Sequence, residues 1–372
     1  MPRRVAIVCG EASGDILGAD LIQALKNYWP DAQFEGIGGP RMIEQGFESH
    51  FPMDRLSVMG LVEPLKRLPE LLSIRRNIIS RYTSEPPDIF IGIDSPDFTL
   101  KIELALKQAG VKTAHYVSPS VWAWRKGRIK LIKRAADLML TLLPFEADFY
   151  KEHQMPVCFV GHPLAYQLTE RPKEEARAAL NVDESKRWLA LMPGSRGNEV
   201  DMMGRLYCEV ALQLQRDGEI DGVLIPASSP ERRAQINEIL SCYGELDATV
   251  FDGRSHDVMS ASDAVLLTSG TTALEAMLLN RPMVVAYKTS RLGYAILSRI
   301  VDTPFIALPN LIAGREVVSE LIQHDASEER LYQEILACLS KAPDDSFSEM
   351  AQQLRQGGGS KAAEALVALC NP

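Results

Sequence analysis

The sequence predicts an α/β fold made of two Rossmann-like, doubly wound domains that face a cleft. Short apolar runs of strand length alternate with segments of helical periodicity, which is the pattern of parallel sheets covered by helices. The chain has 372 residues, too many for one ordinary core, and its 46% hydrophobic content is ample for two cores. A strand, a small-residue turn and a helix open each half, so we expect two domains of similar build.

Composition restricts the functional class. The net charge of −9 argues against a general nucleic-acid-binding protein, although it leaves room for a local basic face. The apolar run at 5–9 is too short for a signal-peptide core, and no run approaches transmembrane length, so we expect a soluble or peripherally membrane-bound protein. Widely spaced cysteines without a Cys-x-x-Cys pair suggest neither zinc nor disulfides and fit a reducing cytosol; they are Cys9, Cys158, Cys208, Cys242, Cys338 and Cys370.

The first unit is a strand at 5–9, a glycine-rich turn at 10–15 and a helix at 16–28. Its glycines are four residues apart, whereas the dinucleotide fingerprint needs Gly-x-Gly-x-x-Gly, so NAD is disfavoured. Small residues in this turn would instead leave room for a bulky ligand. The candidate ligand-side residues are Glu11, Ser13 and Asp15, but Ser13 and Asp15 are equally well explained as the start of a helix.

A strand at 34–37 and a helix at 41–45 follow, and the segment 56–82 combines an apolar stripe with a basic one. Such a segment can lie in a membrane interface, where anionic lipid attracts each cation by about 1 kcal/mol. An amphipathic stripe is more often a core-facing surface helix, and Pro64 and Pro69 argue against one straight helix. The candidate membrane contacts are Leu61, Leu65, Leu68, Leu71, Leu72, Arg75 and Arg76.

The strand at 88–93 ends in Asp-Ser-Pro-Asp-Phe before a helix at 99–109. Carboxylates at the carboxyl end of a parallel strand occupy the place where such sheets bind ligands. We take Asp94 as the candidate general base, because an aspartate at the rim of a partly dry cleft can accept a proton from a hydroxyl. Asp97 directly precedes the helix, so we expect it to cap that helix.

A strand at 112–117 leads into a loop with two of the four tryptophans. Aromatic rings offer flat walls for a sugar or an acyl chain, and the cations that follow suit phosphate or lipid head groups. A packing cluster under the loop explains the tryptophans nearly as well. The candidates on this loop are Ser118, Trp122, Trp124 and Arg125, and strands at 136–142 and 157–160 complete the first domain.

The second domain opens with a strand at 189–192, a turn at 193–197 and a helix at 200–214. Gly194 and Ser195 let backbone amides approach a pyrophosphate, while Arg196 supplies a forked, permanently charged donor. Further strands are predicted at 222–225 and 249–251.

The strand at 264–267 ends in a tight polar turn before a helix at 273–279, and another strand follows at 283–287. Amides at such a helix start have no intrahelical partner, and the helix dipole adds positive potential, so the turn suits a phosphate. Glu275 lies one turn later, where a carboxylate could accept hydrogen bonds from ribose hydroxyls. The candidates on the turn are Ser269, Gly270, Thr271 and Thr272; a threonine that merely caps the helix is the alternative.

The chain resembles the lipid-A-disaccharide synthase family through six collinear motifs that span nearly its whole length. Three lie in the first half: Gly-Glu-Ala-Ser-Gly-Asp-Ile-Leu-Gly at 10–18, Gly-Ile-Asp-Ser-Pro-Asp-Phe at 92–98, and the tryptophan loop at 115–125. The others are Pro-Gly-Ser-Arg-Gly at 193–197, Ser-Gly-Thr-Thr-Ala-Leu-Glu at 269–275, and Leu-Pro-Asn-Leu-Ile-Ala-Gly-Arg-Glu at 308–316. Ala12 and Ser95 depart from residues familiar in the family, beside the charged groups and not on them.

The resemblance implies a metal-independent, inverting glycosyltransferase of the GT-B type without a cofactor. It would transfer 2,3-diacylglucosamine from UDP-2,3-diacylglucosamine to 2,3-diacylglucosamine 1-phosphate, forming a β-1,6 bond and UDP. By family position, Asn310 and Arg315 lie near the donor. The acceptor and lipid side is expected in 1–165, completed by C-terminal helices in 346–372, and the UDP-sugar side in 166–345. The protein would work at the cytoplasmic face of the inner membrane of a Gram-negative cell, on anionic lipid and without nucleic acid.

Rival interpretations are a related GT-B nucleotide-sugar enzyme, such as an epimerase or a soluble-acceptor transferase, and a non-catalytic peripheral lipid-binding protein. The sequence also leaves open the acyl-chain length, a homodimer with or without exchanged C-terminal helices, and the choice between Asp94 and Asp97 as base.

Overall fold

The computed structural model describes residues 2–56, 63–301 and 303–371, and within helices it leaves out the side chains at 63–66, 291, 292, 296 and 297. The chain forms two compact units, Met1–Pro163 with Leu354–Pro372, and Leu164–Gln353. Both are parallel α/β sheets, so the predicted fold class is confirmed. The chain returns to the first unit at residue 354 and not at residue 346, because α16 (Ser346–Gln353) contacts α12 (Thr271–Leu278) and α14 (Leu308–Ala313) of the second unit.

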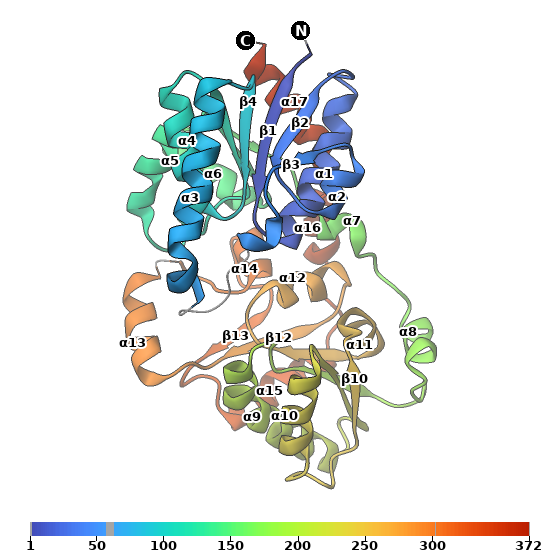
Figure 1. The fold of residues 1–372 in the computed structure, drawn as a ribbon. Coiled ribbons are helices and arrows are strands. Elements are labelled where there is room, and N and C mark those ends of the chain that lie inside the picture. Colours follow the sequence, from blue (N-terminus) through green and yellow to red (C-terminus); the bar gives the residue numbers. More distant parts are fainter. Residues whose placement is uncertain (1, 57–62, 302, 372) are drawn as a thin grey trace. The chain divides into compact units, whose positions relative to one another are not determined.

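Unit 1 is a seven-stranded parallel sheet in the order β3-β2-β1-β4-β5-β6-β7 (Figure 1). The order reverses between β1 and β4, where parallel sheets of this kind bind ligands. The strands are β1 (Arg4–Cys9), β2 (Gln33–Ile37), β3 (Glu48–Ser49), β4 (Ile89–Ile93), β5 (Lys112–Tyr116), β6 (Leu138–Thr141) and β7 (Val157–Phe159).

Alternate residues of β1 face two different cores, as expected for a strand covered on both sides. Val5, Ile7 and Cys9 pack with α1 and α17, whereas Ala6 and Val8 pack with α3 and α4. A third cluster joins α4, α5 and α6 beside β6. These helices are α1 (Ala12–Lys26), α2 (Pro40–Glu44), α3 (Glu63–Ser84), α4 (Pro96–Gln108), α5 (Ile129–Ala135), α6 (Pro144–Glu152) and α17 (Gly359–Cys370), with 3₁₀ turns at Met53–Arg55 and Lys126–Arg128.

The chain returns to unit 1 at its end, and α17 packs along α1 (Figure 1). The Gly359 amide donates to the Asp20 carboxylate at 2.7 Å, and Ala362, Ala363 and Leu366 are fully buried in the α1 core. The two ends of the chain also meet, since the Arg3 guanidinium donates to the Asn371 side-chain oxygen at 2.6 Å.

Unit 2 is a six-stranded parallel sheet in the order β10-β9-β8-β11-β12-β13, with its reversal between β8 and β11. The edge strands β3 and β13 were not predicted, because each is short and only partly buried. The strands are β8 (Trp188–Met192), β9 (Gly222–Ala227), β10 (Ala248–Asp252), β11 (Ala264–Leu267), β12 (Met283–Tyr287) and β13 (Ser319–Ile322).

Helices α9, α10 and α15 bury one face of the second sheet in a continuous apolar cluster. Contacts join α8 with α11, and α12 with α14. The helices are α7 (Leu164–Gln167), α8 (Lys173–Leu180), α9 (Gly197–Arg216), α10 (Pro230–Leu240), α11 (Ser255–Ala261), α12 (Thr271–Leu278), α13 (Arg291–Ile300), α14 (Leu308–Ala313), α15 (Glu328–Leu339) and α16.

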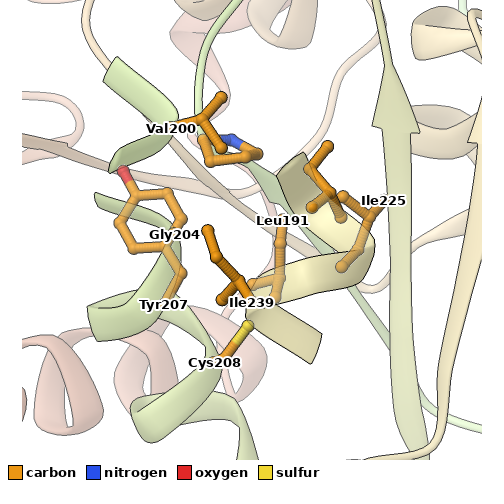
Figure 2. Close-up of a pocket in the computed structure, with 9 residues that line it drawn as sticks. Leu191, Val200, Gly204, Tyr207, Cys208, Ile225 and Ile239 are labelled. Carbon is orange, nitrogen blue, oxygen red and sulfur yellow. The ribbon is translucent and has the colours of Figure 1, made fainter. Parts of the chain in front are cut away.

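A small apolar cavity lies inside this core, between α9, α10 and strands β8 and β9 (Figure 2). Its volume of about 10 Å³ is at the lower limit for holding one water molecule, so it is a packing defect and too small for a ligand. Among the described helices, none has both the length and the hydropathy that a membrane span requires. All six cysteines are free.

Candidate active site

The turns after β1 and β4 meet at the reversal point of the first sheet. Cys9 is the register partner of Ile93, so the two strands end at the same level and their turns lie side by side. A Cβ on Gly10 would stand 2.7 Å from the Ser95 hydroxyl oxygen. Gly10 therefore allows the two turns to approach closely, and only the strand order could have shown that they are neighbours.

The turn after β4 has an unusual backbone. Asp94 and Ser95 are both left-handed, with φ of 54° and 47°, a region that residues other than glycine rarely occupy. The Asp94 amide donates to the Tyr116 carbonyl at 2.9 Å, and the Thr99 hydroxyl donates to the Asp94 carbonyl at 3.0 Å. Two strained residues held by the neighbouring strand and helix are typical of a functional turn.

The structure separates the two candidate carboxylates. Asp97 was predicted to cap α4, but Ser95 is the N-cap and Pro96 is the first helical residue. The Asp97 side chain is 88% exposed and pairs with the Arg128 guanidinium at 2.8 Å. The Asp94 carboxylate is half-buried and has no hydrogen bond or ion pair within the described part of the chain.

Asp15 has a structural role, and its place on the ligand side stays a prediction. Its buried carboxylate accepts the backbone amides of Gly39, Arg41 and Met42, each at 3.0 Å. These three bonds satisfy amides at the start of α2 and use most of the acceptor capacity of the Asp15 carboxylate. Glu11 and Ser13 are exposed on the same turn, with Glu11 at the N-cap of α1.

The tryptophan loop is partly a packing cluster and partly exposed. Ser118 is buried, with its hydroxyl 3.0 Å from the Tyr150 hydroxyl. Trp122 donates its indole N–H to the Glu146 carboxyl at 3.3 Å and meets Phe145 edge-on at 4.7 Å. In contrast, Trp124 is 41% exposed, and the Arg125 guanidinium lies over its ring at 4.4 Å.

Glu146, which the sequence reasoning missed, anchors this loop. Its carboxyl also accepts the Leu143 amide at 3.2 Å. Burial raises the pKa of Glu146 to about 8, against the opposing effect of these hydrogen bonds. The side chain is therefore mainly protonated at neutral pH.

A buried ionisable pair lies beneath the Asp94 turn. His115 Nδ1 is 2.7 Å from the Glu103 carboxyl, and both side chains are fully buried. Burial raises the pKa of Glu103, partly offset by His115. A Cβ on Gly92 would stand 2.1 Å from a Glu103 oxygen, so Gly92 makes room for the pair that fastens α4 to β4 and β5.

Unit 2 contains a pocket of about 360 Å³ at the reversal point of its sheet. The turns after β8 and β11 form most of its wall, with the ends of β9 and β10 beside them. Serine, threonine and glycine dominate the lining, which suits the hydroxyls and phosphates of a nucleotide. Eight predicted donor residues line it, namely Gly194, Ser195, Arg196, Ser269, Gly270, Thr271, Thr272 and Glu275, together with the unpredicted Glu199, Ser228, Gly253 and Ser255.

Glu199 occupies the donors that the sequence assigned to a pyrophosphate. Its carboxylate accepts the amides of Ser195 and Arg196 at 3.1 and 3.2 Å, and pairs with the Arg196 guanidinium at 2.8 Å. A Cβ on Gly194 would stand 2.5 Å from the same carboxylate. The Ser-Arg-x-x-Glu spacing is the sequence signal for this contact, because a glutamate three residues into a helix caps its start.

Glu275 has a titratable neighbour, His256, at the rim of the pocket. The imidazole Nε2 lies 3.6 Å from the carboxylate, and the interaction with Glu275 raises the pKa of His256. The helix that carries Glu275 has Gly270 at its N-cap, so neither threonine of the turn is the capping residue.

Asn310 and Arg315 do not line this pocket. Asn310 is fully buried, and its amide holds the loop before β13: it donates to Val318 and Glu320 and accepts from Val317 and Val318. All the hydrogen-bonding groups of its side-chain amide are used inside the protein, and its position near the donor stays a prediction. Arg315 is exposed and lies 3.4 Å from Asp344.

Helix α3 runs through Pro69 without a break, and its two halves differ. Ile74, Ile78 and Tyr82 are buried in the core of unit 1, so this part of the apolar stripe is ordinary packing. Toward the start, Leu68 is 47% exposed; Leu71, Leu72 and Arg75 are half-buried, and Arg76 is exposed. Leu61 lies outside the described residues, as does the side chain of Leu65.

Within the described residues, no group of three or more His, Cys, Asp and Glu side chains is arranged to hold a metal ion.

The comparisons with known proteins agree over the whole chain. A family model described as lipid-A-disaccharide synthetase matches residues 5–367. The lipid-A-disaccharide synthase of Saccharophagus degradans is 49% identical over 98% of this chain and 96% of its own length. That of Pseudomonas putida KT2440 is 51% identical over 98% of both chains. A crystal structure of the glycotransferase of kitacinnamycin covers 99% of both chains with a TM-score of 0.61 and 16% identity, which shows a shared fold.

Proposed function

Because the chain belongs to the lipid-A-disaccharide synthase family and is a glycosyltransferase of lipid A biosynthesis, we propose that it joins two diacylated glucosamines. The donor is UDP-2,3-diacylglucosamine, the acceptor is 2,3-diacylglucosamine 1-phosphate, and the products are the β-1,6 disaccharide 1-phosphate and UDP. The observation that carries the proposal is the pocket at the reversal point of unit 2, which has the size and the polar lining that a UDP group needs.

The donor binds through its nucleotide. The turns after β8 and β11 present backbone amides and hydroxyls to the diphosphate, and Arg196 supplies a permanent positive charge. These groups stabilise the negative charge that develops on the departing UDP. Glu275 accepts hydrogen bonds from the ribose hydroxyls. Asn310 acts indirectly, because its hydrogen bonds fix the loop before β13.

Transfer is a single displacement with Asp94 as general base. The acceptor 6-hydroxyl attacks the anomeric carbon of the donor, the bond from that carbon to the diphosphate breaks, and the hydroxyl proton passes to Asp94. Attack from the side opposite the leaving group inverts the anomeric centre. The contrast between Asp94, which lacks an ion pair, and Asp97, which is held by Arg128, favours Asp94 for this role.

The enzyme reaches its lipid substrates as a peripheral protein on the cytoplasmic face of the inner membrane. The exposed Leu68 supports this location, because it offers apolar surface on the same helix as the cations Arg75 and Arg76.

The direct test is UDP release from purified protein in neutral detergent. We expect release only when both acylated substrates are present, and no requirement for added magnesium. Strong stimulation by magnesium together with loss of activity in chelator would contradict the proposed role of amides and Arg196. UDP release without the acceptor would point to a hydrolase or an epimerase-like reaction.

The base is tested by Asp94→Asn, which keeps the shape of the side chain and removes the proton acceptor. We expect kcat to fall by roughly 10²-fold or more while UDP binding is little changed. Asp97→Asn is the matched control and should keep its kcat. The reverse pattern would move the base to Asp97.

A further inference from the structure

A second pocket lies beside the Asp94 turn and takes no part in the chemistry proposed above. It has a volume of about 370 Å³ and belongs entirely to unit 1. The start of α4, the end of the tryptophan loop and α5 form its walls. Its lining consists of Pro96, Asp97, Lys101, Arg125, Gly127, Arg128 and Leu131.

The lining is positively charged. Its three cationic side chains and one carboxylate leave a net charge of +2, in a chain whose net charge is −9. The carboxylate of Asp97 pairs with Arg128 at 2.8 Å. Lys101 has no hydrogen bond or ion pair to any described residue, and Arg125 has only the Trp124 ring beneath it. Lys101 and Arg125 therefore line this pocket without a carboxylate partner among the described residues.

The backbone also contributes positive electrostatic potential to the pocket. Helix α4 has 13 residues and begins at Pro96, so the positive end of its dipole borders the pocket. The Arg125 guanidinium lies over the Trp124 ring, with its central carbon 4.4 Å from the ring centre, and this contact limits its rotamer freedom before any ligand binds. A planar donor fixed in this way suits the oxygens of a phosphate.

We infer that this pocket binds the phosphate monoester of the acceptor substrate, a step that rests on the function proposed above. The pocket and the base share one turn, because Asp94 is separated from Pro96 by a single residue. The acceptor sugar carries its phosphate on C1 and its reacting hydroxyl on C6, which hangs from C5, so the two groups lie on either side of the ring oxygen. A phosphate held by Lys101 and Arg125 beside the Asp94 turn therefore keeps the reacting hydroxyl near the same turn.

Asp97 has a defined place in this site. Its carboxylate neutralises Arg128 when the pocket is empty of anion, and it repels a phosphate that enters. Removal of the Asp97 charge and removal of a cation should thus change the KM for the phosphorylated acceptor in opposite directions.

The experiment compares two acceptors, 2,3-diacylglucosamine 1-phosphate and its dephosphorylated form, in neutral detergent micelles without anionic lipid. Lys101→Ala and Arg125→Ala should each raise the KM for the phosphorylated acceptor by about 3- to 10-fold, as expected for a partly solvated charged contact. The dephosphorylated acceptor should be unaffected. Where it is not turned over, its inhibition constant replaces KM. Asp97→Asn should lower the KM for the phosphorylated acceptor with kcat retained.

Lys130→Ala is the matched control, because Lys130 is exposed on α5 in the same basic stretch but does not line the pocket. It should leave both acceptors unchanged. Equal effects of the lysine or arginine variants on both acceptors would overturn the inference, as would an equal effect of the control. Variants that are normal in neutral micelles but impaired on anionic vesicles would assign the cations to membrane head groups and also overturn it. Absence of transfer by the unmodified protein would instead contradict the proposed function.

Discussion

At the scale of single residues, the surroundings of a polar side chain decide its role. Asp15, Asp94, Asp97 and Glu199 all lie in the turn after a strand or in the first turns of the helix that follows. Asp15 accepts three backbone amides at the start of α2, and Asp97 pairs with an arginine. Of these four, only Asp94 has a carboxylate with no hydrogen bond or ion pair to another described residue, and such a carboxylate can accept a proton from a substrate hydroxyl.

Glu199 offers a test of the donor pocket at this scale. Its carboxylate holds the amides and the guanidinium that the diphosphate requires, so UDP must compete with it. Glu199→Gln keeps the shape and removes the charge, and we expect UDP to bind about two- to fivefold more tightly. Uridine, which has no phosphate, should bind unchanged, and calorimetry would measure both.

Glu231→Gln serves as the control, because Glu231 is exposed on the neighbouring helix α10 and bonds to Ser229. Weaker UDP binding by Glu199→Gln would show that the carboxylate pre-organises Arg196 for the diphosphate and does not compete with it.

At the scale of elements, α3 combines a core segment with an exposed one. Serine at Leu68, Leu71 and Leu72 should abolish co-sedimentation with anionic vesicles and change the melting temperature little, because these side chains are exposed or half-buried. Ile78→Ser should instead lower the free energy of unfolding of unit 1 by about 2–5 kcal/mol, since Ile78 is buried.

The salt dependence separates the two parts of this contact. High salt should weaken the attraction of Arg75 and Arg76 to the vesicles, while apolar binding persists. A triple-serine variant that unfolds, or that still sediments, would move the lipid contact to another face.

The buried Glu146 on α6 should make the stability of the protein depend on pH. Glu146 ionises near its ordinary value of 4.5 in the unfolded chain and at about 8 in the folded one. Between these values the folded protein binds more protons, so its stability falls as pH rises, with a slope of at most about 1.4 kcal/mol per pH unit, and levels off above pH 8. Glu146→Gln keeps the acceptor for Trp122 and should remove this fall.

Urea unfolding followed by tryptophan fluorescence from pH 5 to 9 measures the effect. The difference between wild type and Glu146→Gln is the informative quantity, because other groups titrate in both proteins. Parallel pH profiles would mean that Glu146 is ionised in the folded state.

At the scale of the whole molecule, unit 1 is discontinuous in sequence and needs the last helix to complete its core. Leu366→Ala removes a fully buried side chain of α17 and should cost unit 1 about 2–5 kcal/mol. UDP binds unit 2 in our proposal, so it should raise only the unit 2 transition in calorimetry.

Leu331→Ala on α15 is the counterpart, because Leu331 is fully buried in unit 2. It should lower the transition that UDP raises, whereas Leu366→Ala should lower the other one. A single transition that both substitutions and UDP shift alike would show that the two units unfold together.

The sequence by itself determined the local elements and the turns that carry the chemistry. Strands at 264–267 and 283–287 match β11 and β12 residue for residue, because apolar runs of strand length between turn residues encode a buried strand locally. The Asp94 turn and the two turns of the donor pocket were predicted for the same reason.

Only the tertiary structure decided the strand order, and with it which turns meet. The pairing of β1 with β4, and of β8 with β11, arises from long-range packing that no local pattern encodes. The partners of polar side chains depend on the same contacts. Asp15 and Asn310 became structural residues, and the pocket of Lys101 and Arg125 formed, because residues distant in sequence came together in the fold.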